Sequence, residues 1–373
     1  MSEVETGGRP APFVKRAVLI DDRRIELWWS DFVTGAGTDA AFQVLRDGAP
    51  LALVHWTADM PWSYGTVYQQ EHMRTTIALV EPVDVERASD LSVRITGDVR
   101  DYHDQPVDRV RSYSPVYEPY YAQRVTCDSG IVLKASKSVQ PLTLEIAKKT
   151  LDTMLSKIPE VARVLVESDA ECAIFGLLEN AYDVPEHRMG APLATRHIAG
   201  YGGEADNPTS SISEANVIRL RSGRYLTSYP NENILVHEYA HAIHLVGINF
   251  LPDQTMAQRV RDAYANCMDE HLFPDTYASS NYEEYFATLT QIWFNVMQEG
   301  VNGQWDGIRG PVNTREELAT YDPVGYALMA DLYPEAGIPA PWDTCKDSYD
   351  VNGALKPGEV ADIDERFDWK RAV

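Results

Sequence analysis

One apolar stretch, residues 234–246, constrains this chain more than any other segment, because it carries four side chains that can bear charge. They are His237, Glu238, His241 and His244. On an α-helix of about 100° per residue, positions four apart lie nearly above one another. His237 and His241 therefore project from one face, about one turn apart. Imidazole and carboxylate groups are costly in an apolar helix unless they are paired or bind a metal, so the stretch predicts a polar site.

The spacing H-E-x-x-H is typical of zinc hydrolases, in which two histidines bind one ion and the glutamate beside them acts as a base. We expect one Zn2+ per chain, bound by His237 and His241, with Glu238 taking a proton from a zinc-bound water. A core helix with hydrogen-bonded histidines is the alternative. His244 lies about 10 Å beyond His237 at about 1.5 Å per residue. That is too far for a third bond, so we expect His244 to support the ligands, to line the substrate cleft, or to pack in the core.

Charge and hydropathy exclude several classes of partner. The 373 residues carry a formal charge of −23 with a pI near 4.7, which argues against nucleic acid and against anionic membranes. No run approaches the roughly 20 apolar residues of a membrane span, so no membrane insertion is expected. The first ten residues lack the basic and apolar regions of a signal peptide. A cytoplasmic protein is the simplest interpretation, and a secreted mature form is the alternative.

The four cysteines are far apart in the sequence and show no C-x-x-C spacing, which argues against a zinc knuckle. They are Cys127, Cys172, Cys267 and Cys345. We expect buried free thiols, with one disulfide bridge as the alternative.

Two domains are expected in an α+β chain. After a flexible N-terminus at 1–12, residues 13–110 contain short apolar or alternating segments separated by turn signals, the pattern of a β-sandwich of immunoglobulin or fibronectin type III character. The segments are 17–20, 25–29, 41–45, 51–54, 75–80 and 91–95. The Tyr- and Pro-rich residues 111–124 indicate a linker, and 125–373 form the second domain.

Within the second domain, residues 141–157 have the period of an amphipathic helix, and apolar segments around it indicate a mixed sheet. The glycine-rich residues 197–204 lack the strand–turn–helix setting of a phosphate loop, so we expect a flexible loop near the cleft. Residues 211–220 alternate enough to be an edge strand, to which an extended peptide could add. Asn231 is the expected cap of the histidine-bearing helix. One further helix is expected at 321–334, before an irregular tail anchored by Trp342 and Trp369.

A catalytic zinc usually has three protein ligands. The metzincin pattern is not met, because His244 and Gly247 occupy its glycine and third-histidine positions. A glutamate on a later helix is the other option, at Glu283 or Glu284. If Ser280 is the N-cap of that helix, Glu283 completes a capping box with it and Glu284 is free to reach the metal. Glu284 is therefore the expected ligand and Glu283 the fallback.

The order H-E-x-x-H, then Tyr277, Asn281, Glu284 and an aromatic-Phe-Ala sequence, resembles the zinc-site segments of anthrax lethal factor and its relatives among the gluzincin metallopeptidases. The resemblance covers residues 233–244 and 277–289. It implies a zincin-like catalytic domain with active-site helices, in which Glu284 completes the zinc site and Tyr277 stabilises the oxyanion. Asn281, Glu283 and His244 would support the ligands or line the cleft. The chain departs from this pattern at Thr288, where the relatives have a second acidic residue that supports the histidines.

These residues predict a zinc-dependent hydrolase, and a metallopeptidase before other kinds, acting on a peptide or a small amide. Two alternatives stay open. One is a zinc-dependent hydrolase or lyase of a small non-peptide metabolite. The other is a non-catalytic binding protein with a structural zinc, whose fourth ligand would be His244 or a cysteine. The sequence assigns no oligomeric state.

Overall fold

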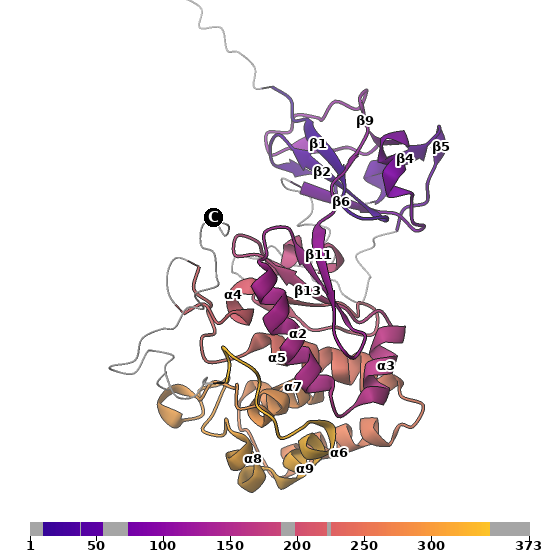
Figure 1. Cartoon of the computed structure of the whole chain (residues 1–373). Helices are drawn as coiled ribbons and strands as arrows, with labels where there is room; N and C mark the ends of the chain where they lie inside the picture. Colours follow the sequence, from indigo (N-terminus) through magenta and orange to yellow (C-terminus); the bar gives the residue numbers. More distant parts are fainter. Residues whose placement is uncertain (1–9, 38, 55–73, 188–197, 222–224, 344–373) are drawn as a thin grey trace, which may run out of the picture. The chain divides into compact units, whose positions relative to one another are not determined.

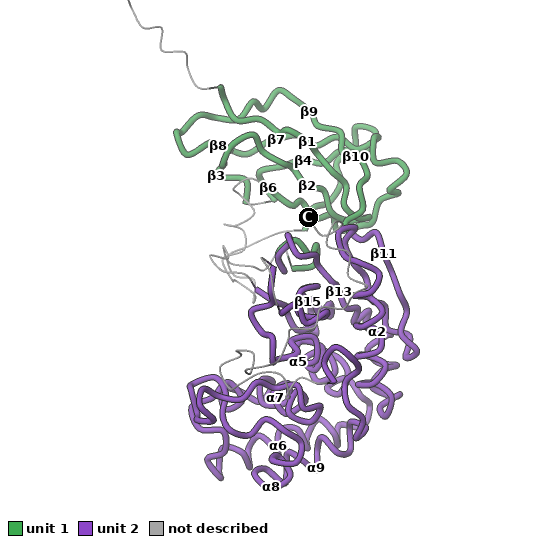
Figure 2. The backbone as a smooth tube through the Cα atoms, turned by 60° about the vertical axis from the view of Figure 1, so that its left-hand side comes forward, with its two compact units in different colours: residues 1–120, 182–196 green, residues 121–181, 197–373 purple. Residues whose placement is uncertain are grey.

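The chain has a mixed α+β architecture, as expected (Figure 1). This computed structural model describes residues 10–37, 39–54, 74–187, 198–221 and 225–343. The chain divides into two compact units (Figure 2). Unit 1 comprises Met1–Tyr120 and Tyr182–Arg196, and unit 2 comprises Tyr121–Ala181 and His197–Val373. Most of the expected flexible N-terminus and the tail with Trp369 lie outside the described residues, and the expected domain boundaries stay predictions.

Unit 1 contains two four-stranded sheets, of order β10-β1-β2-β6 and β5-β4-β7-β9, and a two-stranded pair, β3-β8. The first sheet comprises β1 (Val14–Leu19), β2 (Arg24–Trp29), β6 (Arg74–Ala78) and β10 (Val116–Tyr117); the second comprises β4 (Phe42–Arg46), β5 (Ala49–Pro50), β7 (Leu91–Ile95) and β9 (Ser112–Tyr113); the pair comprises β3 (Val33–Thr34) and β8 (Arg100–Asp101). Buried side chains from both four-stranded sheets, including Leu27, Trp29, Val44 and Val93, form one hydrophobic cluster.

Five of the six segments expected as strands in unit 1 overlap β1, β2, β4, β6 and β7. The exception is 51–54, where Leu53 forms only an isolated bridge with Leu79. Residues 111–124, expected as a linker, contribute strands to each unit. Val116 pairs in parallel with Val18 of β1 in unit 1, and β11 (Tyr121–Thr126) pairs with β12 in unit 2. Backbone pairing of this kind leaves no sign in side-chain periodicity.

Unit 2 is built on a five-stranded mixed sheet of order β11-β12-β13-β15-β14. Its other strands are β12 (Val132–Ser136), β13 (Cys172–Phe175), β14 (Gly200–Tyr201) and β15 (Ser210–Ser213). β12, β13 and β15 are parallel, whereas β11 and β14 run antiparallel at the two sides. The expectation of an edge strand over 211–220 is wrong. β15 lies between β13 and β14, and after Ser213 the chain turns into helix α4 (Glu214–Val217).

Helices make up much of the rest of unit 2, and the predicted helix over 141–157 is confirmed by α2. The helices are α2 (Pro141–Leu155), α3 (Pro159–Glu167), α5 (Ile234–His241), α6 (Thr255–Asp269), α7 (Tyr282–Trp293), α8 (Arg315–Tyr321) and α9 (Pro323–Leu332). α5 continues into the π-helical η5 (Ala242–Gly247) and the 3-10 turn η6 (Ile248–Phe250). Further 3-10 turns are η1 (Asp39–Ala41), η2 (Val85–Asp90), η3 (Ala181–Asp183), η4 (Pro185–His187), η7 (Tyr277–Ser279) and η8 (Val301–Gly303). α5 contacts α7, β14 and β15, so the histidine-bearing helix lies between the sheet and a second long helix.

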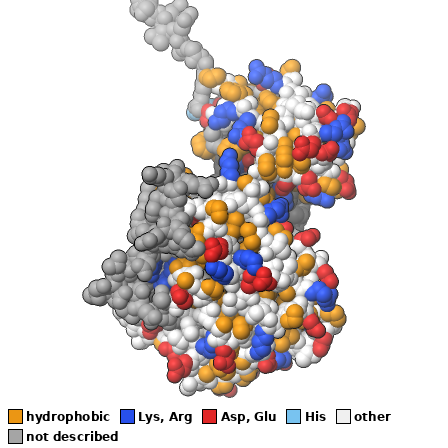
Figure 3. Space-filling model, viewed as in Figure 1, with side chains coloured by type: hydrophobic (Ala, Val, Ile, Leu, Met, Phe, Trp, Pro, Cys, Tyr) orange, Lys and Arg blue, Asp and Glu red, His pale blue; other side chains and the backbone are white. Residues whose placement is uncertain are grey.

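Cys127, Cys172 and Cys267 are buried free thiols, and Cys345 lies outside the described residues. Among the described helices, none has the length and apolar character needed to cross a membrane. On the face that Figure 3 presents, acidic and basic side chains of the described residues are interspersed rather than gathered by sign.

Candidate metal centre

The start of α5 is fixed by two asparagines. The side chain of Asn233 is the N-cap, and its Oδ1 accepts a hydrogen bond from the Val236 amide at 3.2 Å. Asn216 Oδ1 accepts from the Ile234 amide at 2.9 Å, and its Nδ2 donates to the Glu232 carbonyl at 3.0 Å. The bonds to the Val236 and Ile234 amides satisfy groups that a helix leaves unpaired at its first turn. The cap is therefore Asn233, two residues after the expected Asn231.

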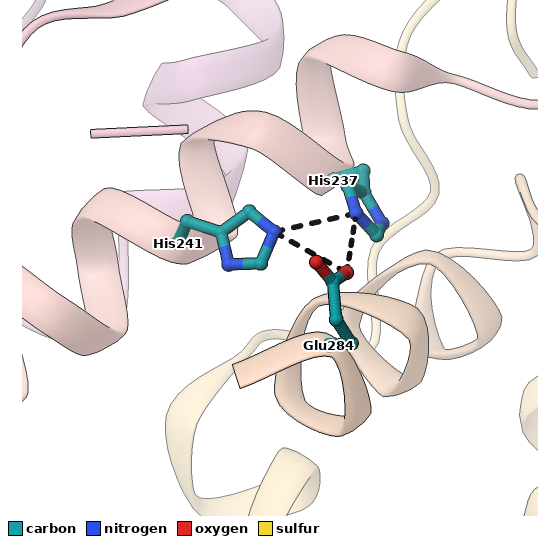
Figure 4. Close-up of side chains that lie close together, drawn as sticks. All are labelled: His237, His241 and Glu284. Atoms are coloured by element: carbon teal, nitrogen blue, oxygen red, sulfur yellow. Dashed lines mark hydrogen bonds and ion pairs between the residues drawn. The ribbon is translucent and has the colours of Figure 1, made fainter. Parts of the chain in front are cut away.

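Three potential ligand atoms converge between α5 and α7 (Figure 4). The Nε2 atoms of His237 and His241 are 3.3 Å apart. Glu284 Oε2 lies 3.1 Å from His237 Nε2 and 3.5 Å from His241 Nε2. Both histidines are 8% exposed. Helical spacing brings the histidines together, and the packing of α7 on α5 brings Glu284 to them.

The donor set and its spacing fit zinc. Two imidazole nitrogens and one carboxylate oxygen are the three protein ligands of one class of catalytic zinc site. At bond lengths of about 2.0–2.1 Å, neighbouring ligand atoms of a tetrahedral ion are about 3.3 Å apart. The three measured separations, 3.1, 3.3 and 3.5 Å, bracket that value. Among the described residues, no other group of His, Cys, Asp and Glu side chains meets this spacing.

The electrostatics of the site favour a cation. Burial by itself lowers the pKa of His237, but the hydrogen bond that His237 donates to Glu284 and the charges of Glu238, Glu284 and Glu232 outweigh it and raise the pKa. For Glu284 the effects have the opposite signs. Burial raises its pKa, but its hydrogen bonds to the two histidines outweigh burial and hold the pKa below its usual range. Three carboxylates around two imidazoles thus stabilise positive charge at the point where the ligand atoms meet.

The cap of α7 is Asn281, and the expectation of Ser280 is wrong. Asn281 Oδ1 accepts from the amides of Glu283 and Glu284 at 2.9 and 2.8 Å, whereas the Ser280 hydroxyl donates to the Tyr277 carbonyl. The shift of one residue occurs because Ser280 is the C-cap of the preceding turn η7. Glu284 nevertheless faces the histidines. Glu283 is not among the three converging side chains, and Asn281 orders the helix that carries Glu284.

Glu238 and Tyr277 are both near this group. Burial raises the pKa of Glu238 above its usual range, against the lowering effect of His237 and His241. The ring of Tyr277 stacks beside that of His237, with centroids 6.1 Å apart. Tyr277 is 48% exposed. Its pKa is raised by partial burial and by the charge and hydrogen bonding of Glu284, so its hydroxyl stays protonated and is a donor.

His244 does not join the ligand group. It is completely buried, its ring packs against Tyr282 and Phe286 with centroids 5.3 and 4.9 Å away, and burial lowers its pKa to about 3. Neither ring nitrogen has a hydrogen-bond partner within the described part of the chain. Three roles were expected for His244, and its surroundings match the third, packing in the core.

The glycine-rich segment lies directly on α5. His197 is outside the described residues, but Gly200 belongs to β14, so the expectation of a flexible loop is wrong there. A Cβ on Gly200 would come within 2.9 Å of Glu238 Cγ, and one on Gly202 within 2.6–2.8 Å of three His241 atoms. A Cβ on Gly203 would lie 3.1 Å from that of Ala242. Any side chain here would separate the strand from the helix, which explains the glycines.

Sequence reasoning missed Gln291, whose side chain contacts His237 Nδ1 from the second turn of α7 beyond Glu284. A signal was available, because positions seven apart share a helix face. It also missed the role of the glycines. Glycine is needed there because β14 and the loop after it pack closely on a helix that is distant in the sequence.

Comparison with known proteins gives little. The chain matches no protein-family profile and no curated protein. Among solved structures, the S-layer protein SbsC is similar at 14% identity over 32% of this chain and 16% of that chain, with a TM-score of 0.24. The PRO-PRO endopeptidase PPEP-2 from Paenibacillus alvei is similar at 16% identity over 54% of this chain and 96% of that chain, with a TM-score of 0.29. This chain thus spans about a sixth of the length of SbsC. Likenesses this weak carry no argument about function.

Proposed function

We propose that this chain is a zinc-dependent hydrolase, and specifically a metallopeptidase with a zincin-like catalytic domain. The observation that supports it most is the convergence of His237, His241 and Glu284 at tetrahedral spacing. These three residues would hold the ion. When bound, zinc supplies a Lewis acid and lowers the pKa of a coordinated water to about 7.

The roles of the other residues follow from their surroundings. Glu238, whose pKa is raised, accepts a proton from the attacking water and returns it to the leaving amine, because a base works best with a pKa nearer to neutrality. Tyr277 donates its hydroxyl hydrogen to the oxyanion that develops on the scissile carbonyl. Its raised pKa keeps that hydrogen in place.

A peptide is the proposed substrate because of β14. It is the outermost described strand on its side of the sheet, and its Gly200 lies against Glu238 of the metal-binding helix. An extended peptide pairing with such a strand would gain main-chain hydrogen bonds and bring its backbone to the site. Unit 1, with its two four-stranded sheets, is proposed to be an accessory β-sandwich of immunoglobulin or fibronectin type III character.

The test is cleavage of a diverse peptide library by the zinc-loaded protein, with Glu238→Gln as the control. We expect cleavage by the wild type and its loss in Glu238→Gln with one zinc per chain retained. A protein that binds no zinc, or a fully active Glu238→Gln, would contradict the proposal. If the protein binds zinc but cleaves no peptide, the substrate is instead a small non-peptide molecule.

A further inference from the structure

Gln291 joins the two helices of the candidate metal centre through a single buried carboxamide. It is completely buried on α7, two turns beyond Glu284. Its Oε1 lies 3.1 Å from His237 Nδ1. Its Nε2 donates to the carbonyl of Asn233, the cap of α5, at 3.0 Å. One side chain therefore contacts both a candidate ligand and the first turn of the helix that carries it.

The neighbours of Gln291 determine which way its amide faces. Nε2 is close to two groups that can only accept, the Asn233 carbonyl and, at 3.4 Å, Glu232 Oε1. The reversed amide would place its oxygen against both of these oxygens. Oε1 must therefore face His237, so His237 Nδ1 is the donor and keeps its proton. In the neutral imidazole that would bind a metal, the other nitrogen, Nε2, has its lone pair available at the point where the ligand atoms converge.

Glu232 is itself held in place by Arg309. Arg309 Nε donates to Glu232 Oε2 at 2.8 Å, and a second guanidinium nitrogen also contacts that oxygen. The two side chains are 13% and 9% exposed. A largely buried, charge-assisted pair of this kind is strong and directional. His237 thus donates to Gln291, Gln291 donates to Glu232, and Glu232 also accepts from Arg309. We call these four residues the His237 relay.

We propose that Gln291 is a positioning residue for the metal ligand His237, and that the His237 relay supplies the support that the resemblance to lethal factor places at residue 288. This inference rests on the proposed function. Thr288 does not take that part, since its buried hydroxyl has no hydrogen-bond partner within the described part of the chain. Partners that fix the second nitrogen of a ligating histidine orient its ring and raise its affinity for the metal.

The test measures zinc affinity by competition with a chromogenic chelator, without any substrate. Gln291→Met keeps the volume of the side chain and removes the acceptor, and we expect it to weaken zinc binding by about 10–100-fold. Gln291→Glu restores an acceptor for His237 Nδ1 but places its second oxygen beside the Asn233 carbonyl and Glu232, so it should recover only part of that loss. Thr288→Val is the matched control on the same helix, and its zinc affinity should stay within about twofold of the wild type.

A second readout uses the wild type alone. In the zinc-loaded protein, the ring N–H proton of His237 should exchange slowly with solvent by NMR, because it is hydrogen-bonded to Gln291. Rapid exchange of that proton, or undiminished affinity in folded Gln291→Met, would overturn the relay while leaving the zinc site intact. Failure of the wild type to bind zinc would overturn both proposals, so the two failures are distinguishable.

Discussion

The rings of His237 and Tyr277 lie stacked at 25° with their centroids 6.1 Å apart, although the two residues belong to different elements. Glu284 contributes to the raised pKa of the Tyr277 hydroxyl through its charge and a hydrogen bond. A phenol held beside a candidate ligand, but outside the group of ligand atoms, can act on a substrate without taking part in metal binding.

The first prediction concerns that hydroxyl. In Tyr277→Phe, kcat should fall by about 100-fold, the usual cost of removing one oxyanion donor. Zinc affinity should stay within about twofold, because the hydroxyl is not a ligand, and KM should change little. Steady-state kinetics on a cleaved peptide and chelator competition give both values. A variant that loses zinc together with activity would show that Tyr277 is part of the metal site instead.

The second prediction separates the two adjacent glutamates. Zinc at about a hundred times its Kd should stabilise the folded chain by about 2.7 kcal/mol, an increase of roughly 5–10 °C in Tm for a unit of this size. Glu284→Gln should lose this increase because a ligand oxygen is replaced. Glu283→Gln should keep it, since Glu283 is outside the converging group. Thermal denaturation with and without zinc decides between them, and the reverse pattern would make Glu283 the ligand.

The third prediction concerns the strand that lies on α5. Gly202→Ala places a methyl group 2.6–2.8 Å from Cβ, Cγ and Cδ2 of His241. We expect a loss of about 1–3 kcal/mol in the free energy of unfolding, the usual cost of overpacking, together with weaker zinc binding as the ring is displaced. Gly337→Ala is the control, because a Cβ there meets nothing within 4 Å. Equal denaturation midpoints for the two variants would refute the close approach.

The fourth prediction is a pH dependence away from the metal centre. Burial raises the pKa of Glu214 to about 7, although hydrogen bonds from the Gln140 amide and the Thr143 hydroxyl oppose the shift. The folded state therefore binds a proton more tightly than the unfolded state. The resulting stability is fully present below about pH 4.5 and is lost as pH rises through 7, by about 3 kcal/mol in total.

Glu214→Gln should remove that loss, because the neutral amide still accepts both hydrogen bonds and has no proton to release. Chemical denaturation of the wild type and the variant at several pH values between 5 and 8 tests this. The wild type should lose stability relative to the variant by up to about 1.4 kcal/mol per pH unit. Parallel pH profiles would mean that Glu214 titrates normally.

The sequence was most informative where a single helix decides the geometry. His237 and His241 are brought together by helical spacing, and their separation of four residues in the sequence predicts this directly. The sequence predicts Ser280 as the N-cap of α7, one residue before the observed Asn281, because serine and asparagine are both good caps. Only the preceding turn η7 decides between them. Nothing local indicates that Gly202 lies on His241, or that residues 214–217 leave the sheet as a helix. Those outcomes depend on contacts between segments distant in the sequence.

The return of the chain to unit 1 at Tyr182 limits how the protein can be dissected. Arg74 of β6 forms an ion pair with Asp183 at 2.9 Å, so unit 1 is completed by a segment that follows β13 in the sequence. A polypeptide that starts at residue 121 would retain Asp183 without Arg74, and one that stops at residue 120 would lack Asp183 altogether. The two units are therefore not interchangeable modules joined end to end, and neither can be gained or lost by a single truncation.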